Sequence, residues 1–551
     1  MTPLFRQATF AQGTSVAMKN MCSGVLRCGC LAAWLFVSAT FVMAQVAVPT
    51  YHNDNYRSGS NSQETVLTLS NVRTQSFGKR ATFAVQGFVY AQPLYVPGLT
   101  IGGTSHNVLF IATEHDQVYA FDVNSGQQLW RNNLLASLGF RYVISPVSSS
   151  DVNCGDLVPE IGITGTPAID TTSGTMYLVA KTKQYDNVTH ITSFYQTLHA
   201  LDIKTGQDKV APVRITATSP GNGTGSVGGI LTFDPLVEGQ RSALLVLRGQ
   251  VVIAWASHCD LGSYHGYVMS FSESNLARTG LYVDTPNGYE GGFWGGGAGP
   301  AADSGGSIYA TTGNGGFDGG TDFGDSVLRL AWVSAGGSIS LRDYFTPWNQ
   351  HTLDQNDSDF GSGGALLLPD QPGTPYPHLL IQVGKEGTID LVNRDNMGHF
   401  HAGSDSQIVQ TIPYAIGGIW GAPAFWNNTA YFGGSNDHLR AFAFDPHAQQ
   451  LSTGSTSASP EYFNFPGPTP SISSNGTNNG IAWIIENDTY GGRNAVLRAY
   501  DATNLGTELY NSEQNPSRDR VGLAIKFTVP TIADGKVFVG AENQVVMYGL
   551  L

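Results

Sequence analysis

Charged residues are scarce in this sequence of 551 residues. Lys, Arg, Asp and Glu make up only 13% of the chain, with 28 basic against 42 acidic residues and a formal net charge of −14. The acidic balance argues against a nucleic-acid partner and against binding to an anionic membrane surface. Low charge combined with 11% aromatic residues also excludes an intrinsically disordered chain, which needs many charges and few aromatic side chains.

Several catalytic and cofactor motifs are absent as well. The sequence contains no phosphate-binding loop, no nucleophile elbow, no zincin motif and no Cys-x-x-Cys-His motif for covalent haem. Apart from the N-terminus, no stretch is long and apolar enough to cross a bilayer. We therefore expect neither a membrane span nor a haem domain in the mature chain.

The N-terminus is typical of a secretion signal. A basic region with Lys19 and Arg27 precedes an apolar stretch from Leu31 to Val42, and Ala44 ends a typical cleavage site. These features predict a signal peptide over residues 1–44 and a periplasmic or extracellular location. Its removal takes away three basic residues and no acidic one, which leaves a mature chain with a formal charge of −17.

Cysteine is rare, with five residues in the whole sequence. Cys22, Cys28 and Cys30 lie within the predicted signal peptide, so the mature chain keeps only Cys154 and Cys259. In an oxidising compartment these two most simply form one disulfide. It would close a loop of about 105 residues and stabilise the fold by roughly 4–5 kcal/mol. The alternative is two buried, unpaired thiols.

Glycine, by contrast, is abundant, at 67 residues, and it accompanies an internal repeat. Each copy has a strand start with a small residue and Pro, a hydrophobic strand, and a strand ending in Ala-x-Asp before Ser/Thr-Gly. The clearest copy runs from Gln92 to Trp130. Later copies begin near Gly165, Gly228, Gly297, Gly363, Trp420, Ser471 and Phe527. The starts are roughly 50 to 75 residues apart, which suits one four-stranded unit plus loops.

Eight starts predict an all-β fold, an eight-bladed β-propeller of four-stranded antiparallel blades. The last copy supplies only three strands, whereas the strand predicted over Gly78–Val85 has no blade of its own. An N-terminal strand that completes the C-terminal blade would close the ring and remove two exposed edges. We assign residues 77–551 to one propeller domain and residues 45–76 to a segment that crosses it. The alternative is seven blades, with the copy at Ser471 as an insertion.

The end of the first copy resembles a motif of known propellers. The run Ala120-x-Asp122-x-x-Ser125-Gly126-x-x-x-Trp130 is similar to the tryptophan-docking motif of pyrroloquinoline-quinone (PQQ) repeat proteins. The small Ala tolerates close packing, and Trp130 would cover the gap between blades. The second copy keeps the pattern from Ala200 to Gly206 but has no Trp. The chain thus resembles a divergent member of the quinoprotein alcohol dehydrogenase-like superfamily over nearly its whole mature length.

This resemblance implies a set of candidate site residues. Trp294, in a Trp-Gly segment, would stack on a flat cofactor, with Trp420 as a second cofactor-binding indole. Asn314 would bind Ca²⁺ through its side-chain oxygen, and Asp357 would be the general base and a neighbour of the metal. Lys385 would hydrogen-bond the quinone oxygens. Each residue also has an ordinary structural role available, in blade packing, a tight turn, an acidic loop or a hairpin.

Departures from the family pattern are equally specific. Cys154 stands alone where the family has two adjacent cysteines over the cofactor, and the family's nearby Arg has no basic counterpart in Pro159–Gly162. The family's Ca²⁺-binding Glu aligns with Leu261, with Asp260 one position away. The loss of an anionic metal ligand and of a carboxylate-binding Arg would weaken cofactor binding.

The sequence therefore predicts an exported PQQ-repeat-like propeller that binds a small molecule, glycan or protein partner at its face, without established catalysis. The first alternative is a divergent PQQ- and calcium-dependent oxidoreductase that acts on an alcohol or sugar. The second is a scaffold for assembly of the cell envelope. Convergence of Asn314, Asp357 and Lys385 on one site would favour the enzyme.

Overall fold

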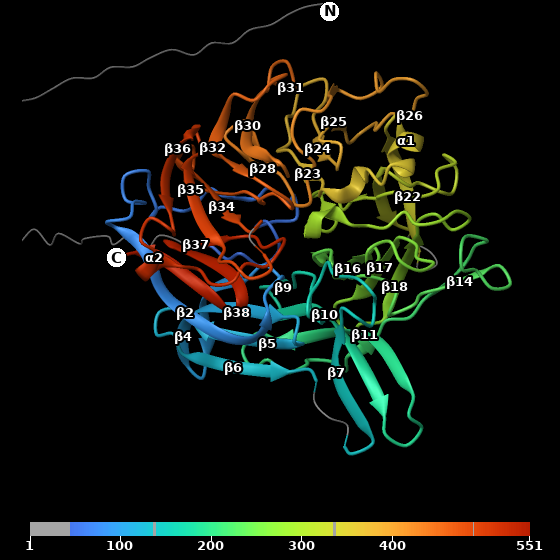
Figure 1. Ribbon diagram of the computed structural model, residues 1–551. Helices are drawn as coiled ribbons and strands as arrows, with labels where there is room; N and C mark the ends of the chain where they lie inside the picture. Colours follow the sequence, from blue (N-terminus) through green and yellow to red (C-terminus); the bar gives the residue numbers. More distant parts are fainter. Residues whose placement is uncertain (1–44, 136–138, 334–337, 489) are drawn as a thin grey trace, which may run out of the picture. The chain divides into compact units, whose positions relative to one another are not determined.

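The computed structural model describes residues 45–135, 139–333, 338–488 and 490–551. The predicted signal peptide lies outside these residues. Strands dominate the described chain (Figure 1). The helical elements are α1 (Gln350–Gln355), α2 (Pro516–Asp519) and the 3-10 turns η1 (Gly295–Gly297) and η2 (Phe360–Ser362). No described helix has the length and apolar character that a membrane span requires.

The strands form a series of mainly antiparallel sheets. We number them sheet 1 to sheet 8 in chain order from β3, and the N-terminal strands β1 and β2 belong to sheets 7 and 8. Sheet 1 contains β3 (Leu94–Ile101), β4 (Thr104–Thr113), β5 (Gln117–Asp122) and β6 (Gln128–Asn133). Sheet 2 contains β7 (Tyr142–Ser148), β8 (Glu160–Ile161), β9 (Ala168–Asp170), β10 (Thr175–Asp186), β11 (Thr192–Asp202) and β12 (Val213–Arg214). A small separate pair, β13 (Thr218–Pro220) and β14 (Ile230–Thr232), follows.

The middle of the chain continues in the same way. Sheet 3 contains β15 (Leu245–Leu247), β16 (Gln250–Trp255), β17 (Tyr267–Ser272) and β18 (Arg278–Val283). Sheet 4 contains β19 (Ala301–Ala302), β20 (Ile308–Thr311), β21 (Val327–Trp332), β22 (Ile339–Thr346) and the parallel β26 (His399–Phe400). Sheet 5 contains β23 (Leu366–Leu367), β24 (Leu379–Val383), β25 (Ile389–Asn393) and β27 (Gln410–Ile412).

The last three sheets use the C-terminal part of the chain together with two N-terminal strands. Sheet 6 contains β28 (Ala424–Trp426), β29 (Thr429–Gly433), β30 (Asp437–Asp445), β31 (Gln450–Leu451) and β32 (Ser457–Phe463). Sheet 7 contains β1 (Ser60–Asn61), β33 (Ser471–Asn475), β34 (Asn478–Glu486), β35 (Val496–Asp501) and β36 (Asn504–Asn511). Sheet 8 contains β2 (Phe77–Phe88), β37 (Thr531–Ala533) and β38 (Lys536–Leu550).

Sheet 8 joins the two ends of the described chain. Strand β2 pairs antiparallel with β38 from Phe77–Leu550 to Phe88–Glu542, and Figure 1 shows the blue β2 beside the red β38. The long β38 turns at Asn543, which has a positive φ of 56°. A Cβ on Gly549 would lie 3.2 Å from the Gly535 carbonyl oxygen, so the two halves of β38 lie side by side. An N-terminal strand therefore adds the outer edge to the C-terminal sheet.

Hydrophobic clusters lie between consecutive sheets. One cluster combines Phe110 of sheet 1 with Ile169 of sheet 2, and equivalent clusters join each later pair of sheets. Another cluster combines Phe538 of sheet 8 with Tyr95 of sheet 1, whose rings stack 5.9 Å apart. Every sheet thus buries both of its faces against neighbours, and the last sheet packs against the first.

The docking motif acts as its sequence predicts. Trp130 of β6 donates a hydrogen bond of 2.9 Å from Nε1 to the carbonyl oxygen of Ile203, in the turn after β11. Gly206 in the same turn lies directly under the indole, because a Cβ there would come 2.5 Å from the ring. Trp130 therefore covers the gap between sheets 1 and 2, as predicted.

An N-terminal segment, residues 48–61, contacts the start of every sheet. In sheets 1, 2, 4, 5, 6 and 7, backbone N–H groups donate to its carbonyl oxygens; the donors are Tyr95, Ile169, Ala302, Leu367, Phe425 and Ile472. The amide groups of Asn55 and Asn61 donate to the carbonyls of Val246 in sheet 3 and Ile532 in sheet 8. The fully buried Arg57 adds hydrogen bonds to the carbonyl oxygens of Leu244 and Pro300.

Candidate functional site

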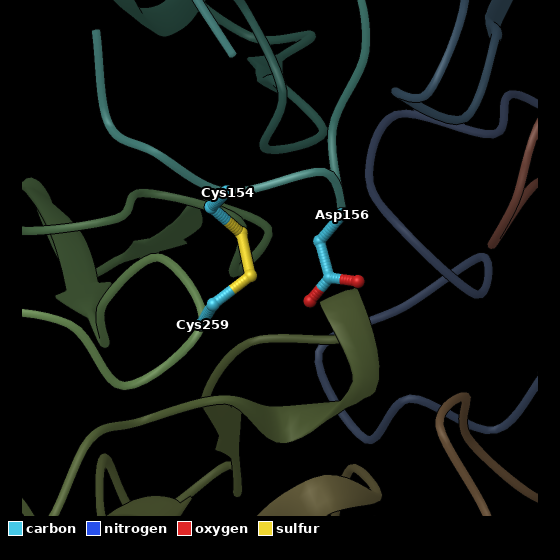
Figure 2. Close-up of side chains that lie close together, drawn as sticks. All are labelled: Cys154, Asp156 and Cys259. Carbon is cyan, nitrogen blue, oxygen red and sulfur yellow. A yellow bond between two sulfur atoms is a disulfide. The ribbon is translucent and has the colours of Figure 1, made fainter. Parts of the chain in front are cut away.

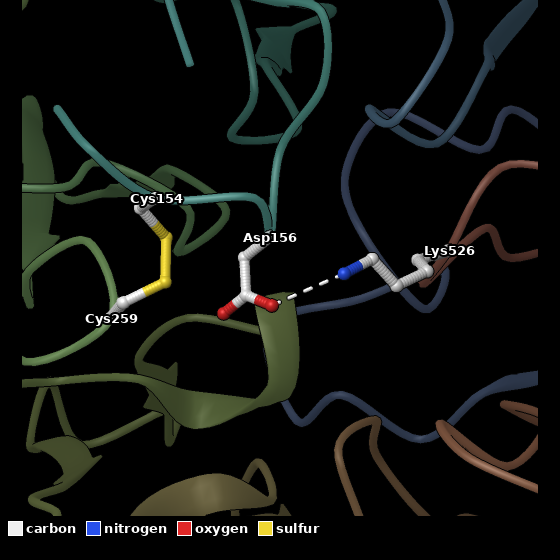
Figure 3. Close-up of a disulfide and its surroundings, with 4 residues drawn as sticks. All are labelled: Cys154, Asp156, Cys259 and Lys526. Atoms are coloured by element: carbon white, nitrogen blue, oxygen red, sulfur yellow. Dashed lines mark hydrogen bonds and ion pairs between the residues drawn. A yellow bond between two sulfur atoms is a disulfide. The ribbon is translucent and has the colours of Figure 1, made fainter. Parts of the chain in front are cut away.

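A disulfide links the loops that follow β7 and β16. Cys154 and Cys259 are bonded, with their Cα atoms 5.7 Å apart, which confirms the predicted pairing. Asp156 lies beside the two sulfur atoms (Figure 2). Metal binding by cysteine needs a thiolate, and both sulfurs are consumed in the bond, so this group does not make a metal site. Asp156 instead forms an ion pair of 3.1 Å with Lys526 (Figure 3).

The disulfide borders a pocket of about 450 Å³, which we call the aromatic pocket. Its lining includes Arg241, Asp260, Trp294, Asp359, Lys385 and Trp420. These residues come from loops next to sheets 3, 4, 5 and 6, and Phe527 adds a ring from the segment before β37. Small-molecule sites are usually apolar clefts with a few convergent polar groups, and this lining has that composition.

Lys385 and the acids around it form one side of the aromatic pocket, which we call the polar wall. Its ammonium group donates to Asp357 Oδ1 at 2.5 Å, to the Asp357 carbonyl oxygen at 3.1 Å and to Asp359 Oδ2 at 2.6 Å. Asp359 is buried, with 5% of its side chain exposed, whereas 69% of the Asp357 side chain is exposed. Burial alone would lower the pKa of Lys385, but the two carboxylates outweigh it and raise that pKa. Lys385 is therefore a fixed cation.

Asn314 joins the same cluster from the loop after β20. Its Nδ2 donates to Asp357 Oδ1 at 3.0 Å, and its backbone N–H donates to Asp359 Oδ1 at 2.8 Å. Its Oδ1 is buried and has no hydrogen-bond partner among the described residues. A buried carbonyl oxygen without a donor is costly, and a bound cation would satisfy it.

Further carboxyl groups face this cluster. Burial raises the pKa of Asp260, although a 2.6 Å hydrogen bond from the Tyr264 hydroxyl opposes the shift; the nearby charges of Asp359 and Asp357 raise it further. Burial, followed by repulsion from Asp260 and other acids, raises the pKa of Glu290 to about 7. Negative charge thus exceeds what Lys385 neutralises, which favours an additional cation at this wall.

The glycine-rich turn after Trp294 sets the position of its indole. Residues 295–297 all have positive φ angles, and a Cβ on Gly296 would clash with the carbonyl oxygen of Gly421. Only glycine allows this close approach of the turn to the segment that carries Trp420. Both predicted indoles consequently line one pocket, and Trp420 also packs edge-on against Phe465 with ring centroids 5.0 Å apart.

Positive charge reaches the aromatic pocket from a position that the sequence did not indicate. Arg241 donates from Nη2 to the Trp420 carbonyl oxygen at 3.0 Å, and its guanidinium lies 3.6 Å from the centroid of the Phe527 ring. Its Nε and Nη1 groups have no acceptor in the described part of the chain. These free donors suit a carboxylate.

A cavity of about 480 Å³ adjoins the aromatic pocket and shares Arg241 and Trp294 with it. Behind its wall at Gly162 and Thr164 lies Glu114, which is fully buried and accepts hydrogen bonds from both residues through Oε2, while Oε1 has no partner within the described ranges. Burial raises the pKa of Glu114 to about 8, so this acid is protonated at neutral pH.

The structure brings together the three residues whose convergence was in question, Asn314, Asp357 and Lys385. Sequence reasoning missed Asp359, the more buried partner of Lys385, although the spacing Asp357-x-Asp359 offered a signal. It also missed Arg241, for which no local signal exists because the residue precedes an ordinary strand start. Leu261, the aligned position of the family's Glu, is 41% exposed, whereas Asp260 lines the pocket.

The donors present suit the two groups that the resemblance implied. The free Oδ1 of Asn314 and the carboxylates of Asp357 and Asp359 are the oxygen ligands that Ca²⁺ prefers. Two indoles and the free donors of Arg241 suit a planar molecule with carboxylate groups.

No protein-family model and no curated protein sequence matches this chain. Solved structures are nevertheless similar. The quinohemoprotein alcohol dehydrogenase from Comamonas testosteroni superposes with a TM-score of 0.58 and 15% identity, over 92% of this chain and 81% of that one. A europium-containing methanol dehydrogenase superposes with a TM-score of 0.56 and 13% identity, over 92% and 98%. At this level of identity the likeness concerns the fold, and the chain has the fold of a divergent PQQ-like β-propeller.

Proposed function

We propose that the aromatic pocket binds a planar anionic quinone of the PQQ type together with Ca²⁺, and that the protein oxidises an alcohol or sugar. The observation that carries this proposal is the cluster of Asn314, Asp357, Asp359 and Lys385 at a pocket with two indoles. The unpartnered Oδ1 of Asn314 supports the proposed Ca²⁺ site, since a buried oxygen without a hydrogen-bond donor can coordinate a cation.

The chain's own residues have distinct tasks in this proposal. Bound quinone and Ca²⁺ would supply the two-electron acceptor and the Lewis acid. Asp357, the exposed carboxylate, takes the proton of the substrate hydroxyl, since it is the acid within reach of solvent and substrate. Asp359 pairs with Lys385 and keeps that ammonium in place. Arg241 binds a carboxylate of the quinone through its free Nε and Nη1.

The test combines binding and turnover. PQQ is titrated calorimetrically into the mature protein with Ca²⁺, and dye-linked alcohol and sugar oxidation is then measured. We expect micromolar or tighter binding that Arg241→Gln weakens about tenfold, and turnover that Asp357→Ala abolishes even at quinone and Ca²⁺ concentrations that saturate the variant. Arg248→Gln, at an exposed arginine on the turn between β15 and β16, is the matched control. If neither heat nor turnover is observed, the quinone proposal is wrong.

A second candidate is ligand binding without catalysis. Its support is that Asp357 is already held by Lys385 and Asn314, so the base is not free in this state. Quinone binding that survives Asp357→Ala, in a wild-type protein without turnover on any alcohol or sugar, would favour this function. If the quinone does not bind either, a small molecule, glycan or protein at the same face would be the ligand to identify.

We also propose that the ring has eight blades and that the protein is exported after cleavage behind Ala44. The pairwise clusters from sheet 1 to sheet 8, and the one that joins sheet 8 to sheet 1, support the blade number. The basic and apolar pattern of residues 1–44 supports export. N-terminal sequencing of the secreted protein tests the cleavage site, which should leave Gln45 first.

A further inference from the structure

A second cavity, of about 710 Å³, lies next to the segments that carry Asp357 and Lys385. Neighbouring residues of the same two segments line it, namely Ser358 and Phe360 from one and Glu386 from the other. Asp359 and Lys385 line the aromatic pocket, whereas their chain neighbours line this cavity. The two segments therefore separate the aromatic pocket from this cavity. We call it the Trp348 cavity.

Two exposed aromatic residues stand at this cavity. Trp348 has 50% of its surface exposed and Tyr414 has 72%, and both line the cavity. Large aromatic side chains that gather around one hollow while remaining exposed mark a binding surface rather than core packing. Their ring faces carry partial negative charge, which attracts cations.

Three acids line the same cavity, and no Lys, Arg or His is among its described lining residues. Glu386 accepts hydrogen bonds from Asn349 Nδ2 and Thr388 Oγ1, and Asp405 accepts one from the Trp348 backbone N–H at 2.8 Å. Burial raises the pKa of Asp405, and the charge of His401 opposes this shift.

Asp390 is the deepest of the three acids. Only 1% of its surface is exposed, its Oδ1 accepts from Thr411 Oγ1 at 2.9 Å, and its Oδ2 has no hydrogen-bond partner in the described ranges. Burial, then the charges of Asp405 and Glu386, raise the pKa of Asp390 to about 8. The acids thus repel one another at the cavity wall, and no basic residue of the described lining compensates their charge. Asp390 Oδ2 remains able to accept a hydrogen bond from a ligand.

We propose that the Trp348 cavity binds an organic cation, an alkylammonium ion whose charge sits between the aromatic rings and the carboxyl groups. The aromatic faces and the carboxylates both favour positive charge, and the apolar part of the ligand packs on Trp348, Tyr414 and the neighbouring Pro347 and Pro413. A neutral sugar would stack on the same rings but would leave the uncompensated negative charge in place. This site is independent of the proposed quinone pocket.

The test uses choline and its uncharged isostere 3,3-dimethyl-1-butanol as probes, titrated calorimetrically into the mature protein. We expect choline to bind and the isostere to bind at least tenfold more weakly. Trp348→Ala and Glu386→Gln should each weaken choline binding by about tenfold. Tyr462→Ala, at an exposed tyrosine of β32 with 55% of its surface accessible, should have no effect. Titrations at pH 7 in two buffers of different ionisation enthalpy should show proton release, since the cation favours ionised Asp390.

Equal affinity for the two probes would overturn the proposal, because recognition would not depend on charge. Binding of glucose but not of choline would overturn it in favour of a sugar site. Unchanged choline affinity in both Trp348→Ala and Glu386→Gln would show that choline binds outside the Trp348 cavity, which would also overturn the proposal. Arg241→Gln, which tests the quinone proposal, should leave choline binding intact, so failure of one proposal leaves the other measurable.

Discussion

Two glycines at equivalent positions of the repeat allow the docking of Trp130 to be measured. Gly126 and Gly206 end the same turn in sheets 1 and 2, with φ angles of +76° and +71° and the same backbone hydrogen bond to Asp122 and Asp202. A Cβ on Gly126 would meet nothing within 4 Å, whereas one on Gly206 would press on the Trp130 ring. Alanine at either site therefore adds the same backbone strain, and only one adds a clash.

The magnitudes follow from this difference. A left-handed alanine costs roughly 1 kcal/mol, so Gly126→Ala should lower the free energy of unfolding by about that amount. Gly206→Ala should lower it by about 3 kcal/mol, because displacing a packed indole costs a further 1–3 kcal/mol or so. Urea titration followed by circular dichroism measures both values, provided that the slope of the transition is unchanged.

A double-mutant cycle isolates the indole. In a Trp130→Ala background, Gly206→Ala should cost no more than Gly126→Ala, because the ring that clashes has been removed. Equal costs of the two glycine substitutions in the wild-type background would refute the docking of Trp130 on the turn at Gly206.

Three other predictions concern the site and its surroundings. Asp359→Asn should lower the free energy of unfolding by about 3 kcal/mol, since it leaves the half-buried Lys385 ammonium without its buried partner. Asp357→Asn, at an exposed acid, should cost less than about 1 kcal/mol in the same urea assay. Equal costs would show that burial does not decide the strength of the two ion pairs. Replacement of Cys154 and Cys259 by Ser should lower the free energy of unfolding by about 4 kcal/mol, and wild-type protein in reductant should reach the same value; no change in either would contradict a disulfide. The pKa of Glu114, about 8 in the fold, exceeds its unfolded value of about 4.3, so the folded state holds the proton more tightly and wild-type stability falls as the pH rises between these values. Glu114→Gln cannot ionise, so its stability relative to wild type should increase from pH 5 to pH 8 and then level off; a constant difference would exclude the protonated acid.

The strands and their pairing could be predicted because they depend on local patterns. The Ala-x-Asp turn with Trp130 identified the repeat, and the lone strand at Gly78 indicated its pairing with the C-terminal sheet. The candidate site was harder, because its chemistry depends on burial and on residues that only the ring brings together. Asp359 looks like Asp357 in the sequence, and only its burial beside Lys385 distinguishes it. Arg241 comes from a different sheet, so no spacing could indicate it.

The segment over residues 48–61 has a consequence for the order of folding. It hydrogen-bonds to one strand of every sheet, from Tyr95 in sheet 1 to Ile532 in sheet 8. It cannot complete these contacts until β37 exists, because Asn61 and Ile532 are 471 residues apart in the chain. The part of the described chain that is synthesised first is therefore fixed last, and contacts of such long sequence separation form slowly. Until all these contacts have formed, some of the contacted strands are paired along one edge only. Their exposed edges favour aggregation, so the nascent protein needs protection until its C-terminal sheet has formed.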